Sequence, residues 1–576
     1  MKKWQTITTD ADLALMSRVL GIKEATAMVM ANRGIRSKNT AIAYLRPNLV
    51  NRSMEMKDAK KAFERISQGI QKKEKIMIYG DYDADGVMST VILYKALKMC
   101  GADVHFYIPN REEEGYGLNI EAVRAIRETE HDLIITCDNG ISALEEVTEA
   151  NKLGMDVIII DHHEPGDVSP TALAIIDPKQ ADCPYPFKEM CAAGLAFMLM
   201  EAFCGYTGQN FKAIREELLA LAAIATVCDI VDLMADNRSM VKEGLKALNA
   251  NKRLNPGLGQ LIALRGYMDK PIDTFTIGFI IGPCINATGR LESAEMSVRL
   301  LLTEDTAEQK SLAQSLYELN EERKAITRKC AERALEKLSE IEDNILVLVD
   351  EQCHESIAGI VAGRIKEATN RPAIVLTSSS EAGILKGSGR SIEAYNMFEA
   401  LCDNRDLFLR FGGHAMAAGL SLPQENADKL KKRLNESNTL TADDLQAIVH
   451  IDGELPTEEI NLILADELSL LAPFGKGNRE PLFVTKNLQV EALRMIPEKS
   501  TLIFTFYNRI KGIAFGLNDL FLQELQENYS EVNYRRVVSG DASGLVMDVA
   551  HTVESNTFNG RTSVQIRIRD FRIKAK

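Results

Sequence analysis

Residues 76–86 read Ile-Met-Ile-Tyr-Gly-Asp-Tyr-Asp-Ala-Asp-Gly, an apolar run that ends in three alternate carboxylates and decides the fold. Two further apolar runs end in the same way: residues 133–136 lead into Cys137-Asp138-Asn139-Gly140, and residues 157–160 lead into Asp161-His162-His163. Short runs that are apolar at every position are typical of parallel strands buried on both faces. Because the carboxyl ends of parallel strands share one edge of a doubly wound α/β sheet, we expect the three motifs to meet in one crevice.

The chain of 576 residues is too long for a single hydrophobic core, and its pattern divides into several parts. Short apolar strands alternate with amphipathic helices from about residue 75 to 281, which indicates an α/β domain. Its helices are expected at 87–99, 120–128 and 142–151, and a further strand at 172–176. Residues 293–341 contain neither Gly nor Pro, which predicts a long connecting helix.

A second α/β unit follows, with strands expected at 345–349 and 373–376 and a helix at 356–368. The remainder changes to short alternating strands, expected at 482–484, 502–507, 513–515, 545–553 and 563–568, with the hairpin signal Asn559-Gly560 between the last two. Five such strands predict a small barrel of the OB kind. We therefore expect a helical segment, a first α/β domain, a connecting helix, a second α/β domain and a barrel, at residues 1–55, 56–290, 291–342, 343–445 and 446–576.

The last predicted strand carries a basic face. Apolar residues at 564, 566 and 568 alternate with Gln565, Arg567 and Arg569. A solvated strand face is the commoner explanation of such alternation. With aromatic residues such as Tyr507 on the same barrel, a surface for single-stranded nucleic acid is the second interpretation.

Composition limits the classes of protein that this chain can be. With 45% hydrophobic and 26% charged residues, a start without an apolar secretion signal and no run long enough to span a bilayer, we expect a soluble, cytoplasmic protein. Ten cysteines without a C-x-x-C pair favour reduced thiols over disulfides or a zinc site. The net charge of −14 argues mildly against nucleic acid, but binding depends on the local field, and cations neutralise the carboxylates that hold them.

The carboxylates of Asp81, Asp83 and Asp85 suit divalent cations, and Gly86 allows the chain to turn into the next helix. Two other interpretations are a solvated acidic turn and the opening of an EF-hand calcium loop. The EF-hand fails because its closing glutamate would be Ile92, and because a strand rather than a helix precedes the motif. The acidic segment alone leaves the metal site and the solvated turn equally open.

Two histidines and a further acidic residue extend the set. A lone histidine at this position would most simply be a hydrogen-bonded residue at the edge of the core. His162-His163, however, follows a buried strand just as the two acidic motifs do. This shared position favours a site of carboxylate and imidazole ligands for Mn²⁺ or Mg²⁺. Asp229 closes the apolar segment 218–228, where an ionised carboxylate is costly unless it is paired or metal-bound; an exposed helix end is the alternative. Two cations about 3.5–4 Å apart polarise a phosphoryl oxygen and activate water, so the motifs predict a two-metal hydrolytic site.

Three segments of the second α/β unit offer donors for phosphate: His354, residues 386–391 (Lys-Gly-Ser-Gly-Arg-Ser) and residues 411–419 (Phe-Gly-Gly-His-Ala-Met-Ala-Ala-Gly). Backbone N–H groups, hydroxyls, Arg and His bind phosphate through charge-assisted hydrogen bonds. Glycines in any one segment could simply form turns. Three such segments in one unit favour phosphate binding.

These motifs resemble those of the DHH phosphoesterase superfamily, and from about residue 50 to the end their order resembles its single-strand-specific 5′→3′ exonucleases. The matching segments are D-x-D-x-D-G at 81–86, D-N-G at 138–140, D-H-H at 161–163, A-T-V-x-D at 225–229, H-E-S-I-A-G-I-V-A-G-R at 354–364 and G-G-H-A-M-A-A-G at 412–419. The resemblance implies a parallel-sheet DHH domain, a DHH-associated domain that binds phosphate and DNA, and an OB-fold domain. It also implies a metal-dependent exonuclease that degrades single-stranded DNA to mononucleotides in repair and recombination, with a single-strand-binding protein and a helicase as partners.

The resemblance also implies roles for individual residues. Two Mn²⁺ or Mg²⁺ ions would be held by Asp81, Asp83, Asp85, Asp138, His162 and Asp229, with Asp138 bridging. His163 would face the scissile phosphate, and Asp161 would orient the site. The 5′ end would be bound by Arg111, Ser388 and Arg390, and the phosphate backbone by Arg290. His354 and His414 are expected to bind phosphate because they belong to the donor segments described above.

One position departs from this pattern, because Cys284 stands where many relatives carry Arg, and a phosphate contact there is in question. Two other functions stay open at this point. One is a DHH phosphodiesterase of short oligonucleotides or cyclic dinucleotides, or a pyrophosphatase-like enzyme, and the other is a catalytically inactive DNA-binding scaffold. Relatives of the first kind usually lack a C-terminal barrel. The intact set of metal ligands argues against the second.

Overall fold

The structure is a computed structural model that describes residues 2–111, 114–338, 342–379, 381–507 and 509–574. The chain forms two compact units. The first comprises Asn51–Asp229 and Glu243–Ala447, and the second comprises Lys3–Val50, Ile230–Lys242 and Ile448–Lys576. In the described part of the chain, a helix with the length and apolar character of a membrane span does not occur.

Within the first unit, a five-stranded parallel sheet forms the core of the first α/β domain, as the apolar runs predict. Its strands are β2 (Lys75–Tyr79), β3 (Asp103–Tyr107), β4 (His131–Cys137), β5 (Asp156–Ile160) and β6 (Ala174–Ile176), in the order β3-β2-β4-β5-β6. From β2 the chain goes to β3 on one side and then to β4 on the other. Ligands of open α/β sheets bind outside the carboxyl ends of strands where the order reverses in this way. The acidic motif after β2 and the Asp138 motif after β4 both begin at this point.

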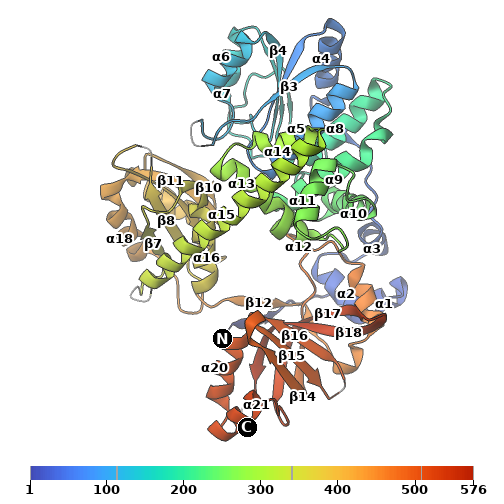
Figure 1. Ribbon diagram of the computed structural model, residues 1–576, viewed down its shortest axis with the longest axis vertical. Helices are drawn as coiled ribbons and strands as arrows, with labels where there is room; N and C mark the ends of the chain where they lie inside the picture. The colour runs from blue at the N-terminus through green and yellow to red at the C-terminus, as the bar shows by residue number, and fades with distance from the viewer. Residues whose placement is uncertain (1, 112–113, 339–341, 380, 508, 575–576) are drawn as a thin grey trace. The chain divides into compact units, whose positions relative to one another are not determined.

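Helices cover both faces of this sheet. They are α4 (Ala59–Lys72), α5 (Ala84–Met99), α6 (Ile120–Glu128), α7 (Leu144–Lys152), α8 (Ala192–Tyr206) and α9 (Arg215–Cys228). Helices α6 and α7 pack on one face through an apolar cluster that includes Val123, Ile134 and Ile159, and α5 and α8 lie on the other face (Figure 1). Helix α5 begins three residues before its predicted start because the Asp83 side chain accepts hydrogen bonds from the Asp85 and Gly86 N–H groups and caps it.

The predicted long connecting helix is confirmed for most of its length, but the segment forms two helices. Helix α14 (Glu295–Leu302) ends before Thr303, and α15 (Thr306–Leu338) begins after Asp305, whose Oδ1 accepts a hydrogen bond from Ala307 N at 2.7 Å. The absence of Gly and Pro does not exclude such a capping residue. The end of the expected helix, residues 339–341, lies outside the described residues. Before α14 come α10 (Ala235–Ala250), α11 (Pro256–Leu264), α12 (Thr274–Thr276), a π-helix (Ile277–Ile281) and α13 (Gly282–Leu291).

The long helix α15 leads from α13 to the second α/β domain (Figure 1). This domain contains a mixed sheet in the order β10-β11-β9-β8-β7, in which only β7 and β8 are parallel. The strands are β7 (Leu346–Val349), β8 (Ala373–Ser378), β9 (Ile384–Arg390), β10 (Arg410–His414) and β11 (Ala417–Pro423), and the helices are α16 (Glu355–Thr369), α17 (Met397–Cys402) and α18 (Ala427–Ser437). The two predicted strands and the predicted helix are therefore confirmed as β7, β8 and α16.

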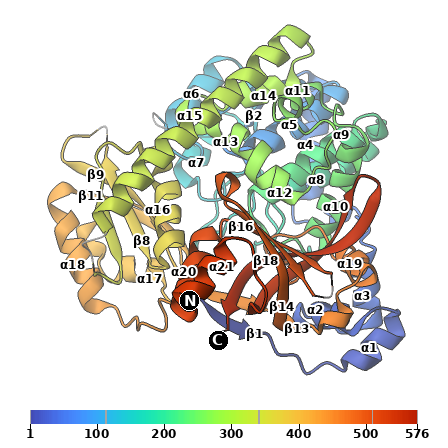
Figure 2. The same ribbon diagram turned by 60° about the horizontal axis from the view of Figure 1, so that its bottom comes forward.

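Five strands of the second unit close into a barrel, which confirms the OB-like fold (Figure 2). They are β14 (Phe483–Ile496), β15 (Thr501–Phe506), β16 (Lys511–Phe515), β17 (Val546–Phe558) and β18 (Arg561–Ile573), and β17 pairs back onto β14. The short strand β13 (Gly453–Glu454) extends the sheet beside β14. Helices α20 (Asn518–Asn528) and α21 (Glu531–Val538), between β16 and β17, were not predicted.

The first fifty residues are largely helical, as expected, with α1 (Leu13–Leu20), α2 (Glu24–Asn32) and α3 (Lys38–Leu45). They also contain a strand that was not predicted, β1 (Lys3–Thr6), which pairs in parallel with β12 (Ile448–Ile451). Met30 of α2 shares an apolar core with Leu468 of α19 (Leu462–Ser469) and with the barrel residue Phe483. The N-terminal helices therefore complete the same unit as the barrel.

Candidate metal centre and phosphate pocket

The acidic loop after β2 is held in one conformation by its own backbone. A Cβ on Gly86 would lie 2.5 Å from the carbonyl oxygen of Asp81, so only glycine allows the chain to turn back so closely. Asp83 caps α5, and Ala84 N donates to Asn286 Oδ1 of α13 at 2.7 Å. Asp81 and Asp85 are buried, with exposed fractions of 3% and 1%. The loop therefore presents its carboxylates inward rather than to solvent.

Side chains from the other three motifs converge on this loop. Asp138 follows β4 with a φ of 65°, a left-handed conformation that is uncommon outside glycine and concentrates at functional sites. His162 Nε2 lies 3.1 Å from Asp138 Oδ1 and 3.7 Å from one carboxylate oxygen each of Asp85 and Asp229. Asp229 sits at the C-cap of α9, so a helix end, not a strand end, delivers this residue.

Three overlapping groups of these residues could each hold a metal ion, with ligand atoms within 4.8 Å of one another. They are Asp81, Asp83 and Asp138; Asp85, His162 and Asp229; and Asp138, His162 and His163. Asp138 belongs to two groups and contacts His162 of the third, so it stands between two possible cation positions. All six residues expected to be ligands thus lie in one cluster.

The electrostatics of the cluster require positive charge. Burial, reinforced by neighbouring carboxylates, raises the pKa of Asp81 and of Asp138 well above the usual range and that of Asp85 to about 7. Within the described residues, Asp81 Oδ1 has no hydrogen-bond partner although it is buried. Oxygen and imidazole donors without a thiolate suit Mn²⁺ or Mg²⁺, and a cation would neutralise charges that otherwise repel. The residues present therefore fit a pair of divalent ions.

A second layer of hydrogen bonds positions the cluster. The Asp85 carboxylate accepts from Ala192 N and Ala193 N, at 2.7 and 2.8 Å, at the start of α8. Burial lowers the pKa of His162 to about 3, so its imidazole is neutral and able to ligate. Burial also opposes charge on His163, but the hydrogen bond and charge of Asp161 raise the pKa of His163 to about 9. Asp161 Oδ1 accepts from His163 Nδ1 at 2.7 Å, and Asp161 Oδ2 from Ile141 N at 3.0 Å.

Sequence reasoning missed Tyr116 at this site. Its hydroxyl donates to the Asp138 carbonyl oxygen at 2.9 Å and lies 3.3 Å from His163 Nδ1, while 55% of the residue is exposed. The flanking glycines Gly115 and Gly117 both have positive φ, so the pattern Gly-Tyr-Gly at 115–117 is the sequence signal for this residue. Tyr116 lies where it could contact both the metal centre and a bound substrate.

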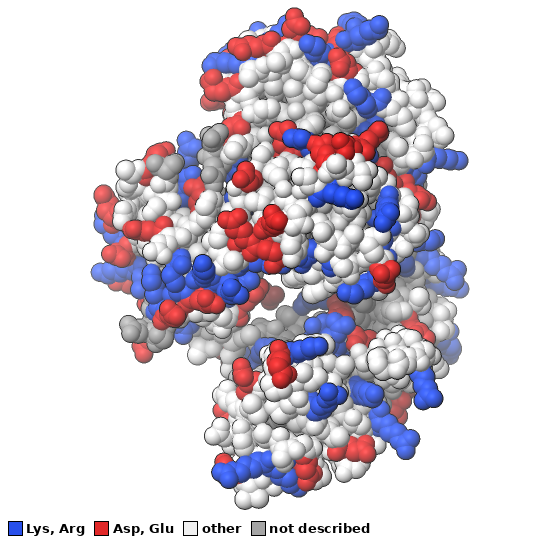
Figure 3. Space-filling model, viewed as in Figure 1, with Lys and Arg blue, Asp and Glu red and all other residues white. Residues whose placement is uncertain are grey.

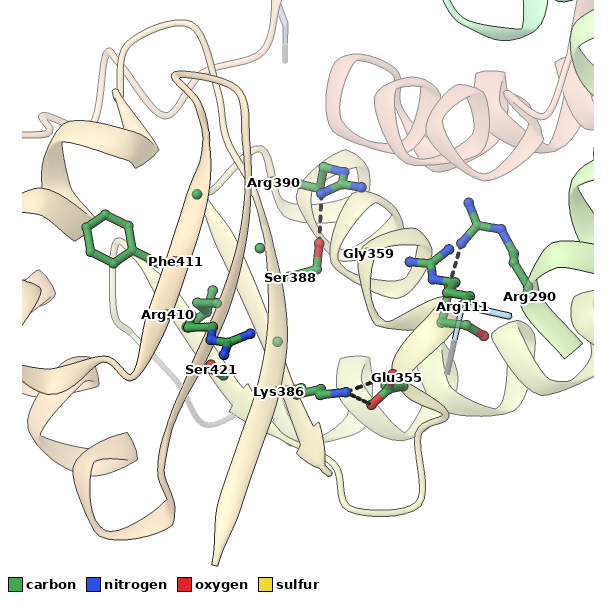
Figure 4. Close-up of a pocket in the computed structure, with 15 residues that line it drawn as sticks. Arg111, Arg290, Glu355, Gly359, Lys386, Ser388, Arg390, Arg410, Phe411 and Ser421 are labelled. Carbon is green, nitrogen blue, oxygen red and sulfur yellow. Dashed lines mark hydrogen bonds and ion pairs between the residues drawn. The ribbon is translucent and has the colours of Figure 1, made fainter. Parts of the chain in front are cut away.

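Four of the predicted phosphate-binding residues line one pocket of about 470 Å³ (Figure 4). Ser388 and Arg390 come from β9, and Arg390 Nη1 donates to Ser388 Oγ at 2.9 Å. Arg290, from the end of α13, donates to the Ser356 carbonyl oxygen, and Arg111 lies over the ring of Tyr82. Burial and the neighbouring guanidiniums of Arg111 and Arg323 lower the pKa of Arg290 to about 10, so like charges crowd here too.

The structure does not bring the other two predicted residues into this pocket. His354 caps α16, accepts from Ser356 N, and lines a neighbouring recess with Glu351 and Ser378. His414 ends β10 on the exposed surface, outside the lining of the pocket. Cys284 is fully buried and donates to the Ile280 carbonyl oxygen at 3.3 Å, so it cannot contact a phosphate.

The predicted basic face of the last strand is largely neutralised. Arg567 pairs with Glu554, and Arg569 Nη2 lies 2.5 Å from Glu480 Oε2. Gln565 was expected to face outward but is buried, where it donates to Glu554. On the one face of the barrel seen in Figure 3, basic and acidic side chains are scattered among uncharged ones. The exposed aromatic side chains of the barrel include Tyr507 and Phe515, which are 59% and 60% exposed.

Comparison with known proteins agrees with this arrangement. Residues 75–226 match the DHH family, N-terminal domain, residues 342–438 match the DHHA1 domain, and residues 451–570 match the RecJ OB domain. The chain is 38% identical to the single-stranded-DNA-specific exonuclease RecJ of Bacillus subtilis, over 99% of this chain and 70% of that protein. It is 36% identical to the Escherichia coli protein of the same name, over 93% and 94%. The crystal structure of RecJ in complex with Mn²⁺ from Thermus thermophilus superposes with a TM-score of 0.83 at 30% identity, over 99% of this chain and 79% of that one.

Proposed function

This chain belongs to the RecJ family of the DHH phosphoesterase superfamily, and from that premise we propose that it removes mononucleotides from the 5′ end of single-stranded DNA. One observation carries the proposal: the acidic cluster and the arginine pocket are joined by a single helix. Asn286 of α13 binds the acidic loop, and Arg290, one turn later, lines the pocket. A terminal phosphate in the pocket would place the adjoining phosphodiester beside the cluster.

The ligand set for two cations is Asp81, Asp83, Asp85, Asp138, His162 and Asp229, with Asp138 shared. When bound there, two Mn²⁺ or Mg²⁺ ions polarise the phosphoryl group and lower the pKa of water. His163, whose raised pKa keeps it protonated near neutral pH, faces the scissile phosphate and stabilises the charge that develops on its oxygens. Asp161 orients that imidazole through their 2.7 Å hydrogen bond.

The 5′ phosphate is bound by Arg390, Ser388 and Arg111, and Arg290 contacts the next part of the backbone. The exposed aromatic residues of the barrel, Tyr507 and Phe515, are suited to stacking on bases further along the strand. The enzyme would act in DNA repair and recombination, supplied with single strands by a helicase and a single-strand-binding protein. A cytoplasmic location agrees with ten cysteines that are all free thiols.

Labelled substrates test this function. We expect a 5′-labelled single strand to release labelled mononucleotide in Mn²⁺ or Mg²⁺, and none in EDTA, whereas a 3′-labelled strand should shorten progressively. RNA and a dinucleotide, assayed in parallel, measure selectivity. Release of the 3′ label first, or activity on the dinucleotide alone, would refute the proposal.

A further inference from the structure

The phosphate pocket is wider than one phosphate requires, and its cationic residues lie at two ends. Its volume of about 470 Å³ is in the range of pockets that hold whole small molecules. Figure 4 shows Arg390 and Ser388 at one end, and Arg410, Ser421 and Lys386 at the other. Arg390 and Ser388 bind the 5′ phosphate in the proposed function, whereas Arg410, Ser421 and Lys386 have no role in it.

Strand register explains this division. Lys386, Ser388 and Arg390 alternate along β9 and therefore share one face of the sheet. Lys386 pairs with Ser421 of β11, which pairs in turn with Arg410 of β10, so these three form one row across the strands. Two residues along β9, Ser388 pairs with Gly419, which pairs with Gly412. At about 3.3 Å per residue, the Lys386 row lies roughly 13 Å from Arg390.

Two of the three residues in the middle row, Gly412 and Gly419, carry no side chain. A Cβ at Gly412 or at Gly419 would meet no atom within 4 Å, so packing does not require glycine at either position. Neither residue has a left-handed φ, so backbone conformation does not require glycine either. Two glycines that the protein does not need for its own packing keep open the space between the two cationic ends.

The two ends also differ in their charge balance. Lys386 Nζ lies 3.0 Å from Glu355 Oε2, so Glu355 partly neutralises it. The guanidinium of Arg410 is exposed, and within the described residues it has no hydrogen bond or ion pair. Arg410 can therefore bind an anion without breaking an existing contact, and Ser421 adds a hydroxyl donor beside it.

We propose that Arg410, Ser421 and Lys386 form a second phosphate subsite, so that the pocket accepts a 5′ end carrying two or three phosphates. This inference rests on the proposed function, because it assumes that Ser388 and Arg390 bind the phosphate nearest the sugar. Hydrolysis of the first phosphodiester then consumes one water, the 3′ oxygen of the first nucleotide leaves with a proton, and that nucleotide departs with its polyphosphate intact. The remaining strand begins with a monophosphate, so only the first cleavage senses the extra groups.

The test is single-turnover release of the first nucleotide by the full chain in Mn²⁺, with otherwise identical strands bearing a 5′ monophosphate or a 5′ triphosphate. We expect the wild type to reach half-maximal rate at similar enzyme concentrations for both strands and to release a nucleoside triphosphate from the second. Arg410→Ala should raise that concentration about tenfold for the triphosphate strand and less than about twofold for the monophosphate strand, as expected for one charge-assisted contact. Ser421→Ala should act in the same direction, and Lys432→Ala, an exposed residue of α18, is the matched control.

Two results would overturn the subsite. In one, the wild type needs more than tenfold more enzyme for the triphosphate strand. In the other, Arg410→Ala weakens both strands equally, which would assign Arg410 to an internal phosphate of the polymer. In either case degradation of the monophosphate strand from its 5′ end would leave the proposed function standing, whereas failure to degrade any strand would refute both.

Discussion

The metal centre and the phosphate pocket both gather side chains of one charge, but the fold builds them differently. Most of the carboxylates come from turns directly after strands, and Asp229 comes from the end of α9. Asp81, Asp85 and Asp138 are buried, and their pKa values are raised. The five cations of the pocket, Arg111, Arg290, Lys386, Arg390 and Arg410, come partly from the face of a sheet, where solvent reaches several of them. A fully buried cluster depends strongly on its counterion for stability as well as function, whereas a partly solvated cluster depends on its ligand less for stability.

Replacement of the shared ligand should break the metal centre without breaking the fold. We expect Asp138→Ala to reduce exonuclease activity by on the order of 10⁴-fold, as for catalytic groups that act as a unit. Its thermal midpoint in EDTA should not fall, because the variant has one fewer buried carboxylate. Glu145→Ala, an exposed residue of α7, is the control. Retention of more than a few per cent activity in saturating Mn²⁺ would remove Asp138 from its shared position.

Thermal unfolding measures how strongly the stability of each cluster depends on its bound ion. Mn²⁺ at about 100 times its dissociation constant should stabilise the protein by roughly 2.7 kcal/mol, which raises the thermal midpoint by several degrees. Orthophosphate should change the midpoint less, because the cations of the pocket are only partly buried and Arg410 is exposed. An equal shift with both additives would show that the two clusters depend alike on their ligands.

Asp177 lies at the same edge of the sheet but is not among the expected metal ligands. It therefore allows the effect of burial on a carboxylate to be measured without the effect of a bound cation. Asp177 follows β6, is fully buried, and its pKa is raised to about 7 by burial. The folded protein therefore holds this proton more tightly than the unfolded chain, and stability falls as pH rises from about 4 through 7. Between pH 5 and 8 in constant Mn²⁺, the wild type should lose roughly 2 to 3 kcal/mol relative to Asp177→Asn. The free energy of unfolding in urea is measured for both proteins at both pH values. An equal change with pH in the two proteins would contradict this prediction.

The smallest effect is expected in the pocket. Arg390→Ala should reduce the preference for a 5′-phosphorylated over a 5′-hydroxyl strand about tenfold, because one charge-assisted contact is lost. Arg433→Ala, an exposed residue that pairs with Asp406, should leave the preference unchanged. If Arg390→Ala slows both strands equally, Arg390 contacts the internal backbone instead.

The metal centre and the phosphate pocket also differ in how far they could be predicted from the sequence. The acidic motifs were found because each follows its strand directly, and parallel strands bring their ends together whatever the details of packing. The pocket was found only in part, because its residues are selected by strand alternation and pairing, which no contiguous motif records. His414 was expected in it from the glycine-rich segment, but Arg410, four residues earlier, lines the pocket instead. The cap at Asp305 was not predicted because it interrupts a long run of residues that favour a helix. Strand β1 was not predicted because it is short and lies beside a segment with a helical pattern.

The pairing of β1 with β12 affects how the chain is made. Trp4 Nε1 donates to Asp570 Oδ2 at 2.7 Å across 566 residues of sequence. At 5 to 20 residues per second, the N-terminal strand waits roughly 30 s to 2 min for its partners to leave the ribosome. During that time Val29 and Met30, which are fully buried in the finished unit, have no barrel to cover them. The nascent chain therefore carries an apolar segment without its final cover until the barrel has been made, and such a segment is prone to aggregation during synthesis.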